Sequence, residues 1–181
     1  MVLVLFQSIG GFKGDLLGVV VDKVVYVMPV SVSVIVSVWE VPPPSDSLDL
    51  NRMQLRADSI NRYLYSLYRG FIDEGGYVVG IVDGDGYVEG LNFVFGLATP
   101  TLRVATVYVS RLWTTDIRLY VERLAKEVAH ELGHLLGLSH CPDKRCVMSF
   151  SNTLNDVDRK RLWFCPSCRA KLVERWKHNS D

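Results

Sequence analysis

The sequence predicts an α/β (α+β) fold in a single compact domain, with a mixed, mostly parallel twisted sheet of about four to five strands and three main helices. The length of 181 residues suits one domain with a proper core. An apolar share of 49% is typical of a globular chain. A strand–helix–strand succession in residues 2–39 favours parallel strands joined by a right-handed crossover. We expect residues 1–137 to form the sheet with its helices, and residues 138–181 to form a smaller C-terminal part.

The first sheet unit is predicted within residues 2–39. Residues 2–6 are an apolar run that indicates a short buried strand. Apolar residues then recur at helical spacing over residues 17–28, and Pro29 ends this helix because proline lacks the backbone N–H that the next turn needs. Serine and valine alternate over residues 31–39, which is typical of a strand, and we place this strand near the centre of the sheet.

The middle of the chain contributes a further helix and strand. Residues 42–47 are rich in proline and serine and are expected to be a plain connecting loop. Apolar periodicity predicts a helix over residues 52–69, and residues 77–82 are expected to form a third strand. Residues 83–86 read Asp-Gly-Asp-Gly. They are expected to make a tight turn, because two acids do not complete a calcium loop.

Two more strands and the longest helix follow. Residues 91–98 and 104–110 are predicted strands, Thr114 or Thr115 is expected to cap the helix, and Asp116 suits the dipole of its first turn. The helix turns an apolar stripe toward the sheet, formed by Val121, Leu124, Ala125, Val128, Leu132 and Leu135. Its charged residues are expected to face elsewhere: Glu122, Arg123, Lys126 and Glu127. The last segment, from Leu154 to Trp176, is expected to be helical in part.

Charge and hydropathy argue against two broad classes of protein. The formal net charge is zero and the pI is about 6.9, which disfavours a nucleic-acid binder that neutralises phosphates. The longest apolar stretch, residues 16–39, contains Asp22 and Lys23, which are costly to bury in lipid, so we expect core and no membrane span. Residues 1–7 are too short for an export signal and lack its positive charge, so we expect a cytoplasmic protein.

The most informative stretch reads His-Glu-x-x-His-x-x-Gly-x-x-His and holds three of the four histidines of the chain. His130 and His134 are four residues apart, so a helix places them on one face, where both can reach one metal ion. On a continuous helix His140 would lie about 15 Å from His130, at about 1.5 Å per residue, so the chain must turn back. Gly137 can end the helix, because glycine accepts the left-handed backbone conformation.

This spacing predicts a catalytic zinc site. Three neutral nitrogen ligands leave one coordination position open for water. Glu131 lies beside the metal-facing side of the helix, where it can act as a general base. The alternative is three ordinary surface or core histidines on an amphipathic helix, and the gathering of three of the four histidines in one motif argues against it. The fourth, His178, lies in a charged tail and is assigned no role.

The four cysteines predict a second metal site. Cys141 and Cys146 form one close pair and Cys165 and Cys168 another, which is metal-ligand spacing. Disulfides are rare in the reducing compartment where we expect this chain. Four thiolate ligands leave no position for water, so this zinc is expected to be structural. The alternative is four free buried thiols. With the histidine site, the prediction is two zinc ions per chain.

Together the two motifs resemble the archaemetzincins, a family of zinc metalloproteases in the metzincin clan. The resemblance rests on the histidine motif, on the spacing of Cys141, Cys146 and Met148, and on Cys165-Pro166-Ser167-Cys168. One departure is the stretch from Met148 to Cys165, which is one residue shorter than the family's spacing and which a loop can absorb.

The resemblance implies a metzincin-like domain with a C-terminal zinc knuckle. It also implies a methionine turn in which Met148 lies under the catalytic zinc as a hydrophobic floor. A peptide substrate would then pair antiparallel with a strand along the cleft, for which residues 91–97 are the candidate.

The leading hypothesis is a zinc-dependent peptidase that acts on peptide or protein substrates, with a monomer as the default state. Glu131 would take a proton from zinc-activated water and later pass a proton to the leaving nitrogen. A second hypothesis is a zinc-stabilised binding or adaptor module with weak or silent catalysis, and chelator-sensitive cleavage of peptides separates the two. A third is nucleic-acid binding through the cysteine knuckle, although a solvated face explains its basic neighbours more simply: Lys160, Arg161, Arg169, Lys171, Arg175 and Lys177.

Overall fold

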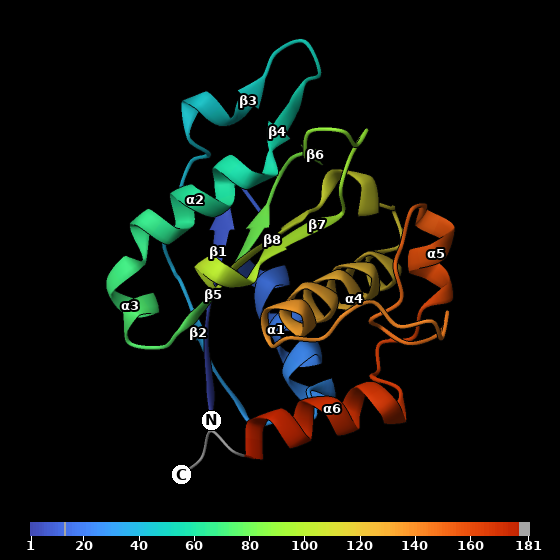
Figure 1. Ribbon diagram of the computed structural model, residues 1–181. Helices are drawn as coiled ribbons and strands as arrows, with labels where there is room; N and C mark the ends of the chain where they lie inside the picture. Colours follow the sequence, from blue (N-terminus) through green and yellow to red (C-terminus); the bar gives the residue numbers. More distant parts are fainter. Residues whose placement is uncertain (13, 178–181) are drawn as a thin grey trace.

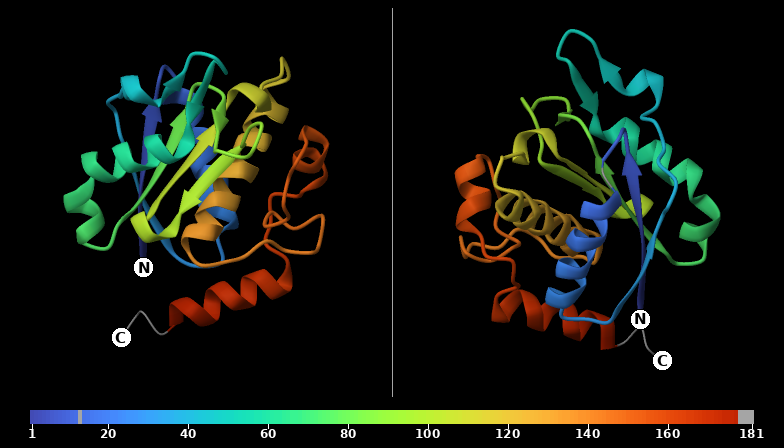
Figure 2. Two further views of the ribbon diagram at one scale, coloured as in Figure 1. Left: turned by 45° about the horizontal axis from the view of Figure 1, so that its top comes forward. Right: turned by 180° about the vertical axis from the view of Figure 1, so that it is seen from behind.

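In a computed structural model that describes residues 1–12 and 14–177, the chain folds around a five-stranded sheet with helices on both faces (Figure 1 and Figure 2). Along the sheet the strands are β2 (Val32–Val36), β1 (Val2–Ile9), β5 (Tyr77–Val82), β8 (Val104–Tyr108) and β7 (Gly96–Thr99). Neighbouring strands are parallel except β7, which runs antiparallel to β8. The predicted mixed, mostly parallel sheet is therefore confirmed.

The helices form two layers, one on each face of the sheet. On one face α1 (Gly14–Val27) and α4 (Ile117–Leu135) share a core with β1 and β5, and on the other lie α2 (Ala57–Leu67) and α3 (Arg69–Asp73). Every residue of β5 is buried, as expected of a parallel strand that is covered on both faces. Single turns of 3-10 helix lie at Ser45–Ser47, Pro100–Leu102 and Ser110–Leu112.

The strand predicted over residues 31–39 lies at an edge of the sheet, so its predicted central place was wrong. β2 pairs parallel with β1 and ends the strand order. Its side chains are half-buried or exposed, and Ile35 is 43% exposed. Alternating serine and valine give a strand one polar face, which an edge position tolerates and a strand covered on both faces does not. The parallel β1–α1–β2 unit itself is confirmed.

The helix predicted over residues 52–69 begins only at Ala57. Leu55 is buried as part of a strand, and its match to the helical period was a coincidence. Met53, the residue directly before this strand, has a φ of 53°, which an α-helix does not allow. A small second sheet occupies this region, formed by β3 (Leu48–Asp49), β4 (Gln54–Arg56) and β6 (Gly86–Tyr87).

The strand predicted over residues 91–98 is shorter than expected. β7 begins at Gly96, and the residues before it form a loop in which Val94 makes an isolated bridge to Gly86. The next predicted strand, over residues 104–110, is present as β8 and ends at Tyr108. As a result, part of the candidate substrate-pairing segment is a loop rather than a strand.

The long helix α4 begins as predicted but with a different cap. Asp116, not Thr114 or Thr115, is the N-cap, and its carboxylate accepts hydrogen bonds from the backbone N–H groups of Arg118 and Leu119. Aspartate at this position satisfies N–H groups that have no partner inside the helix and also suits the helix dipole. The predicted apolar stripe of α4 is buried throughout.

The charged residues of α4 do not all face away from the core, as had been expected. Arg123 is 7% exposed, and Lys126 and Glu127 are each 2% exposed. The C-terminal part of the chain covers this side of α4, so the helix is enclosed more widely than its apolar stripe indicates. Burial is possible because each charge has an ion-pair partner: Asp158 for Arg123, Glu122 for Lys126 and Lys160 for Glu127.

The C-terminal part carries α5 (Leu154–Arg159) and α6 (Pro166–Lys177). α6 lies where β5 begins, because the rings of Trp176 on α6 and Tyr77 on β5 pack edge to face at 6.3 Å between centroids. Buried residues of this part belong to the same core as α1 and α4. The division of the domain after residue 137 stays a prediction. Among the described residues, no helix has both the length and the apolar character needed to cross a membrane.

Candidate metal centres and active-site cleft

His130 and His134 face each other from one side of α4, as predicted. Their Nε2 atoms are 3.0 Å apart. The Nδ1 atom of each ring lies 2.8 Å from a backbone carbonyl oxygen, that of Val147 for His130 and that of Leu138 for His134. A carbonyl oxygen can only accept, so each Nδ1 carries the proton. Each neutral ring therefore turns an Nε2 lone pair toward the other ring.

Two lone pairs at that distance repel each other unless a cation lies against both. Protonation does not supply this cation at neutral pH, because burial lowers the pKa of His130 well below its ordinary value and lowers that of His134 as well. Neutral imidazole nitrogens are common zinc ligands, and a carbonyl partner on the other nitrogen is the usual way to orient them. The pair fits a zinc ion.

The third histidine returns to this pair through a turn that depends on Gly137. α4 ends at Leu135, and Gly137 has a φ of 94°. Its N–H donates to the carbonyl of His134, and the N–H of Leu138 donates to that of Gly133, both at 2.9 Å. These two bonds define a Schellman cap. The cap reverses the chain, so that the ligand atoms of three residues lie within 4.8 Å of one another: His130, His134 and His140.

Glu131 lies beside the histidines and is pressed against β7. Its side chain is buried, and a Cβ added at Gly96 would lie only 2.5 Å from its Oε1. Burial, helped by the nearby Glu127 carboxylate, raises the pKa of Glu131 to about 8. A carboxylate with a raised pKa accepts a proton more readily than a solvated one. A zinc ion beside the histidines would favour the deprotonated form of Glu131, and in that form its position and surroundings suit a general base.

Sequence reasoning gave no role at this site to three residues beside it, and it placed one of them, Lys160, on a solvated face although Lys160 is 2% exposed. Glu127 lies one turn before Glu131, and its carboxylate pairs with Nζ of Lys160 at 2.7 Å, with both side chains almost fully buried. After burial itself, the charge of Lys160 contributes to the lowered pKa values of the three histidines. Phe150 packs its ring edge to face on His140, 5.0 Å between centroids. Glu127 lies four residues before Glu131, and this helical spacing could have placed it beside the site. No local sequence pattern marks Lys160 or Phe150.

Met148 packs on α4 at a glycine. The side chain is fully buried, and a Cβ added at Gly133 would overlap its Sδ atom. The carbonyl of Met148 also accepts a hydrogen bond from the N–H of Cys141 at 2.8 Å. The methionine turn is thus tied both to the helix that carries two histidines and to the chain just after His140.

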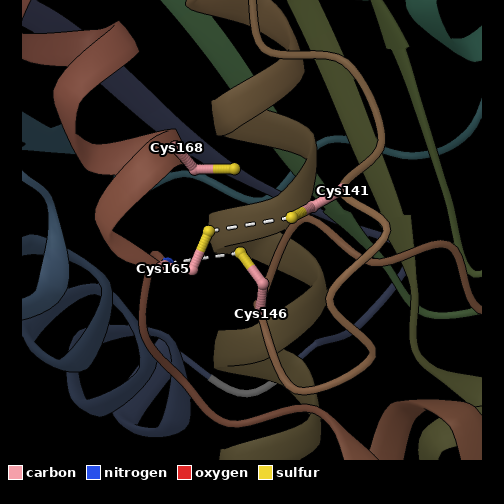
Figure 3. Close-up of side chains that lie close together, drawn as sticks. All are labelled: Cys141, Cys146, Cys165 and Cys168. Carbon is pink, nitrogen blue, oxygen red and sulfur yellow. Dashed lines mark hydrogen bonds between the residues drawn. The ribbon is translucent and has the colours of Figure 1, made fainter.

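The four cysteines turn their sulfur atoms toward a common centre, from the loop after α4 and from the start of α6 (Figure 3). All four Sγ atoms lie within 4.8 Å of one another, and those of Cys141 and Cys165 are 3.7 Å apart. Four sulfur ligands at about 2.3 Å around a tetrahedral zinc would be about 3.8 Å apart, whereas a disulfide is about 2.05 Å long. Burial raises the pKa of the Cys146 thiol to about 11, so a thiolate at Cys146 needs a cation beside it. The cluster fits a structural zinc ion.

The histidine and cysteine clusters meet at one peptide bond, because His140 belongs to the first and Cys141 to the second. α6 contacts both regions. It carries Cys168 near its start, and further along it Arg175 donates from Nη1 to the carbonyl oxygen of Gly137 at 2.9 Å. The turn that places His140 is therefore held from both sides. His178, to which no role was assigned, lies outside the described residues.

A cleft of about 880 Å³ opens over the histidines and Glu131. One wall is formed by β7 and the loop before it, and the other by residues 137–140 and 150–152. The lining combines apolar residues with polar groups that include the three histidines and Glu131, as a binding site for a small molecule or peptide requires. β7 is the last strand in the sheet order, so one of its edges has no strand neighbour in the described sheet.

Comparisons with known proteins agree with this geometry. Residues 39–174 match the sequence model of peptidase family M54. The chain is 46% identical over 166 residues to an archaemetzincin from Aeropyrum pernix, which covers 92% of this chain and 91% of the relative. The structure of the present chain resembles the crystal structure of an archaemetzincin from Methanopyrus kandleri. The two are 38% identical in sequence and have a TM-score of 0.81, over 97% of this chain and 96% of that one.

A second solved structure is similar over nearly the whole chain as well. It is a zinc-dependent peptidase from Methanocorpusculum labreanum, at 30% identity and a TM-score of 0.83, over 94% of this chain and 99% of that one. Sequence and structure thus agree over nearly the whole length of the relatives. The chain therefore belongs to peptidase family M54, the archaemetzincins.

Proposed function

We propose that this protein is a zinc metallopeptidase in which His130, His134 and His140 hold the catalytic zinc and Glu131 is the general base. The observation that carries the proposal is the pair of Nε2 lone pairs 3.0 Å apart, next to a buried carboxylate in a cleft. A zinc ion with three histidine ligands supplies a Lewis acid and lowers the pKa of water at its open position.

The chain's own residues perform the remaining steps. Glu131 receives the proton of the attacking water on a carboxylate whose pKa burial has raised, and returns it to the leaving nitrogen. The free edge of β7 binds the peptide main chain antiparallel and so aligns its carbonyl group. The apolar lining around Phe95 and Phe150 limits water around the reacting groups.

The second zinc has a structural role in this proposal. Cys141, Cys146, Cys165 and Cys168 hold it in a closed site that leaves no position for water. Such a site contributes directly to folding, because its ligands come together only in the folded chain. The expected content is two zinc ions per chain.

The test combines metal analysis of gently purified protein with digestion of a peptide library. Cleavage that a chelator abolishes and zinc restores, together with two zinc ions per chain, supports the proposal. The positions of the cuts also show whether the enzyme removes terminal residues or cuts internally. A protein that holds two zinc ions and cuts no peptide would instead be the binding or adaptor module. Salt-dependent binding to DNA without cleavage would favour a nucleic-acid role for the cysteine knuckle.

A further inference from the structure

The loop between β6 and β7, residues 88–95, forms one lip of the cleft. Its C-terminal end is tied to the small sheet by the bridge from Val94 to Gly86. Its tip has little burial to hold it, because Leu91 is 52% exposed. Within the loop the N–H of Leu91 donates to the carbonyl of Val88 at 3.1 Å, and polar contacts from outside the loop add to this bond.

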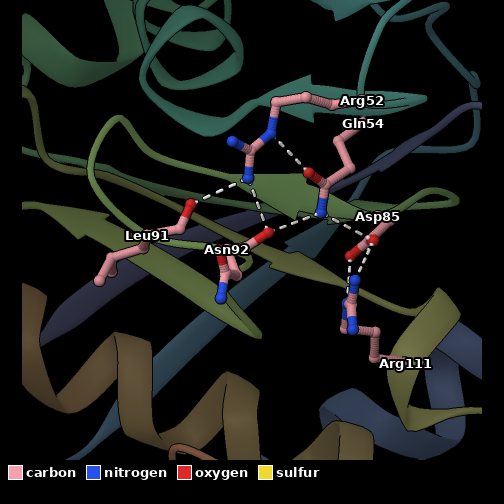
Figure 4. Close-up of polar contacts among 6 residues, drawn as sticks. All are labelled: Arg52, Gln54, Asp85, Leu91, Asn92 and Arg111. Atoms are coloured by element: carbon pink, nitrogen blue, oxygen red, sulfur yellow. Dashed lines mark hydrogen bonds and ion pairs between the residues drawn. The ribbon is translucent and has the colours of Figure 1, made fainter.

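Arg52 supplies the first of these contacts (Figure 4). Its Nη2 donates to the carbonyl oxygens of Leu91 and Asn92, both at 2.9 Å, and its Nε donates to Oε1 of Gln54 at 2.8 Å. The guanidinium also lies 4.2 Å from the centroid of the Tyr87 ring. The guanidinium thus holds two consecutive carbonyls of the loop tip through one nitrogen and Gln54 through another, an arrangement that the single nitrogen of an ammonium group does not reproduce.

The second contact is a chain of side chains that runs from Gln54 through Asp85 to Arg111 (Figure 4). Nε2 of Gln54 donates to the Asn92 carbonyl and to Asp85, both at 2.9 Å. Both oxygens of Asp85 accept from Arg111 at 2.7 Å. The guanidinium of Arg111 lies 4.1 Å from the centroid of the Phe93 ring, which lines the cleft. We call these four side chains the lip clamp: Arg52, Gln54, Asp85 and Arg111.

We propose that the lip clamp is a positioning device for the substrate, in which Arg52 holds loop 88–95 in one conformation and so sets how tightly the cleft binds a peptide. The proposal rests on the proposed peptidase function. The four clamp side chains lie outside the described residues that line the cleft, so they act through the loop rather than on the substrate. A lip that is ordered before binding loses less conformational entropy when a peptide is bound. The clamp therefore affects binding and KM more than kcat.

The test compares Arg52→Ala and Arg52→Lys with Arg62→Ala. The last is a matched control, which removes an exposed arginine and its ion pair with Asp58 on α2. Two quantities are measured on zinc-loaded protein: backbone hydrogen exchange over residues 88–95, and the dissociation constant of a peptide hydroxamate, which binds an active-site zinc without being cleaved. Where peptides are cleaved, KM and kcat are measured as well.

In Arg52→Ala, exchange over the loop is expected to be faster by about tenfold or more, because charge-assisted hydrogen bonds to its tip are lost. The hydroxamate is expected to bind several-fold more weakly, and KM is expected to rise with kcat nearly unchanged. Arg52→Lys keeps the charge but not the planar fork, so it is expected to resemble Arg52→Ala. Arg62→Ala is expected to match the parent in both measurements.

Parental exchange over residues 88–95 in Arg52→Ala would overturn the clamp. Faster exchange with parental hydroxamate affinity would overturn its link to binding. If the parent binds the hydroxamate and shows the expected exchange but cuts no peptide, the peptidase proposal fails while the clamp stands. Should Arg52→Ala fail to fold, Arg111→Lys breaks the two-bond contact with Asp85 and gives the same two measurements.

Discussion

At the scale of single residues, the active-site cleft depends on glycines that let backbone and side chains come close together. Gly96 allows β7 to lie directly against the carboxyl group of Glu131, and Gly133 allows Met148 to pack on α4. These contacts fix two groups beside the histidines without any hydrogen bond between side chains. Packing against Gly96 and a hydrogen bond with the backbone of Ala98 therefore set the position of the Glu131 carboxyl, and its chemistry and its position can be tested separately.

The chemistry is tested by Glu131→Gln. Glutamine keeps the shape of the side chain but cannot accept the proton, so peptidase activity is expected to fall by about 10²–10⁴-fold. The zinc content of the histidine site is expected to stay parental, since Glu131 is proposed as a base and not as a ligand. Glu74→Gln, at an exposed position, is the control. Parental activity would refute the role of Glu131, and loss of zinc would make it a ligand or an essential support of one.

The position is tested by Gly96→Ala. The added Cβ would lie 2.5 Å from Oε1 of Glu131, so the carboxyl group must move. A misplacement of about 1 Å at a reacting group costs about 10²-fold in rate, and kcat is expected to fall by that order with zinc content unchanged. Gly70→Ala is the control, because a Cβ there meets no atom within 4 Å. Unchanged kcat in Gly96→Ala would mean that β7 does not hold the carboxyl in place.

At the scale of secondary-structure elements, local sequence patterns predicted well which helices and strands exist. They predicted less well where these elements end and where they lie in the sheet. The long helix, the parallel β1–α1–β2 unit and the convergence of three histidines follow from spacing, because helical geometry and a glycine turn leave few alternatives. The edge place of β2 and the late start of α2 depend on pairing with distant strands, which periodicity does not report. Lys160 was missed for the same reason, since its partner Glu127 is distant in sequence.

The start of α4 gives an element-scale prediction. Asp116→Ala removes the carboxylate that accepts from two backbone N–H groups at the N-terminus of the helix. The free energy of unfolding is expected to fall by about 1 kcal/mol, the usual effect of losing such a cap. Thermal or denaturant unfolding measures it, with Thr115→Ala as the control at the neighbouring exposed position. Equal losses in the two variants would show that Asp116 has no special capping role.

At the scale of the whole molecule, the C-terminal part holds the turn that the helix alone cannot place. On one side of His140 the N–H of Cys141 donates a hydrogen bond to the carbonyl of Met148. On the other side Arg175 donates a hydrogen bond to the carbonyl of Gly137. The cysteine cluster adds a third restraint, because Cys141 directly follows His140 and its Sγ faces that of Cys165. The histidine site and the cysteine site are therefore expected to be coupled, so that a change in zinc binding at one alters the zinc affinity of the other.

Cys168→Ser tests this coupling. Cys168 is distant from His140 in sequence and belongs to the other cluster, yet its loss is expected to weaken zinc binding at the histidine site by about tenfold or more. His130 and His134 are expected to keep loose binding. Competition with a chelator measures the affinity, and Ser167→Ala is the control on the same turn of α6. Equal affinities in Cys168→Ser and the parent would show that α4 and Gly137 alone place His140.

The shared peptide bond between the two clusters also has a consequence for the order of events during synthesis. A nascent chain emerges from its N-terminus, so both helical histidines are made before Cys165 and Cys168. Where the thiolates fix the third histidine, a ribosome-bound chain carries an unfinished active site until α6 has emerged and closed the cysteine cluster. For a peptidase, the order of the sequence then delays cleavage until α6 has folded.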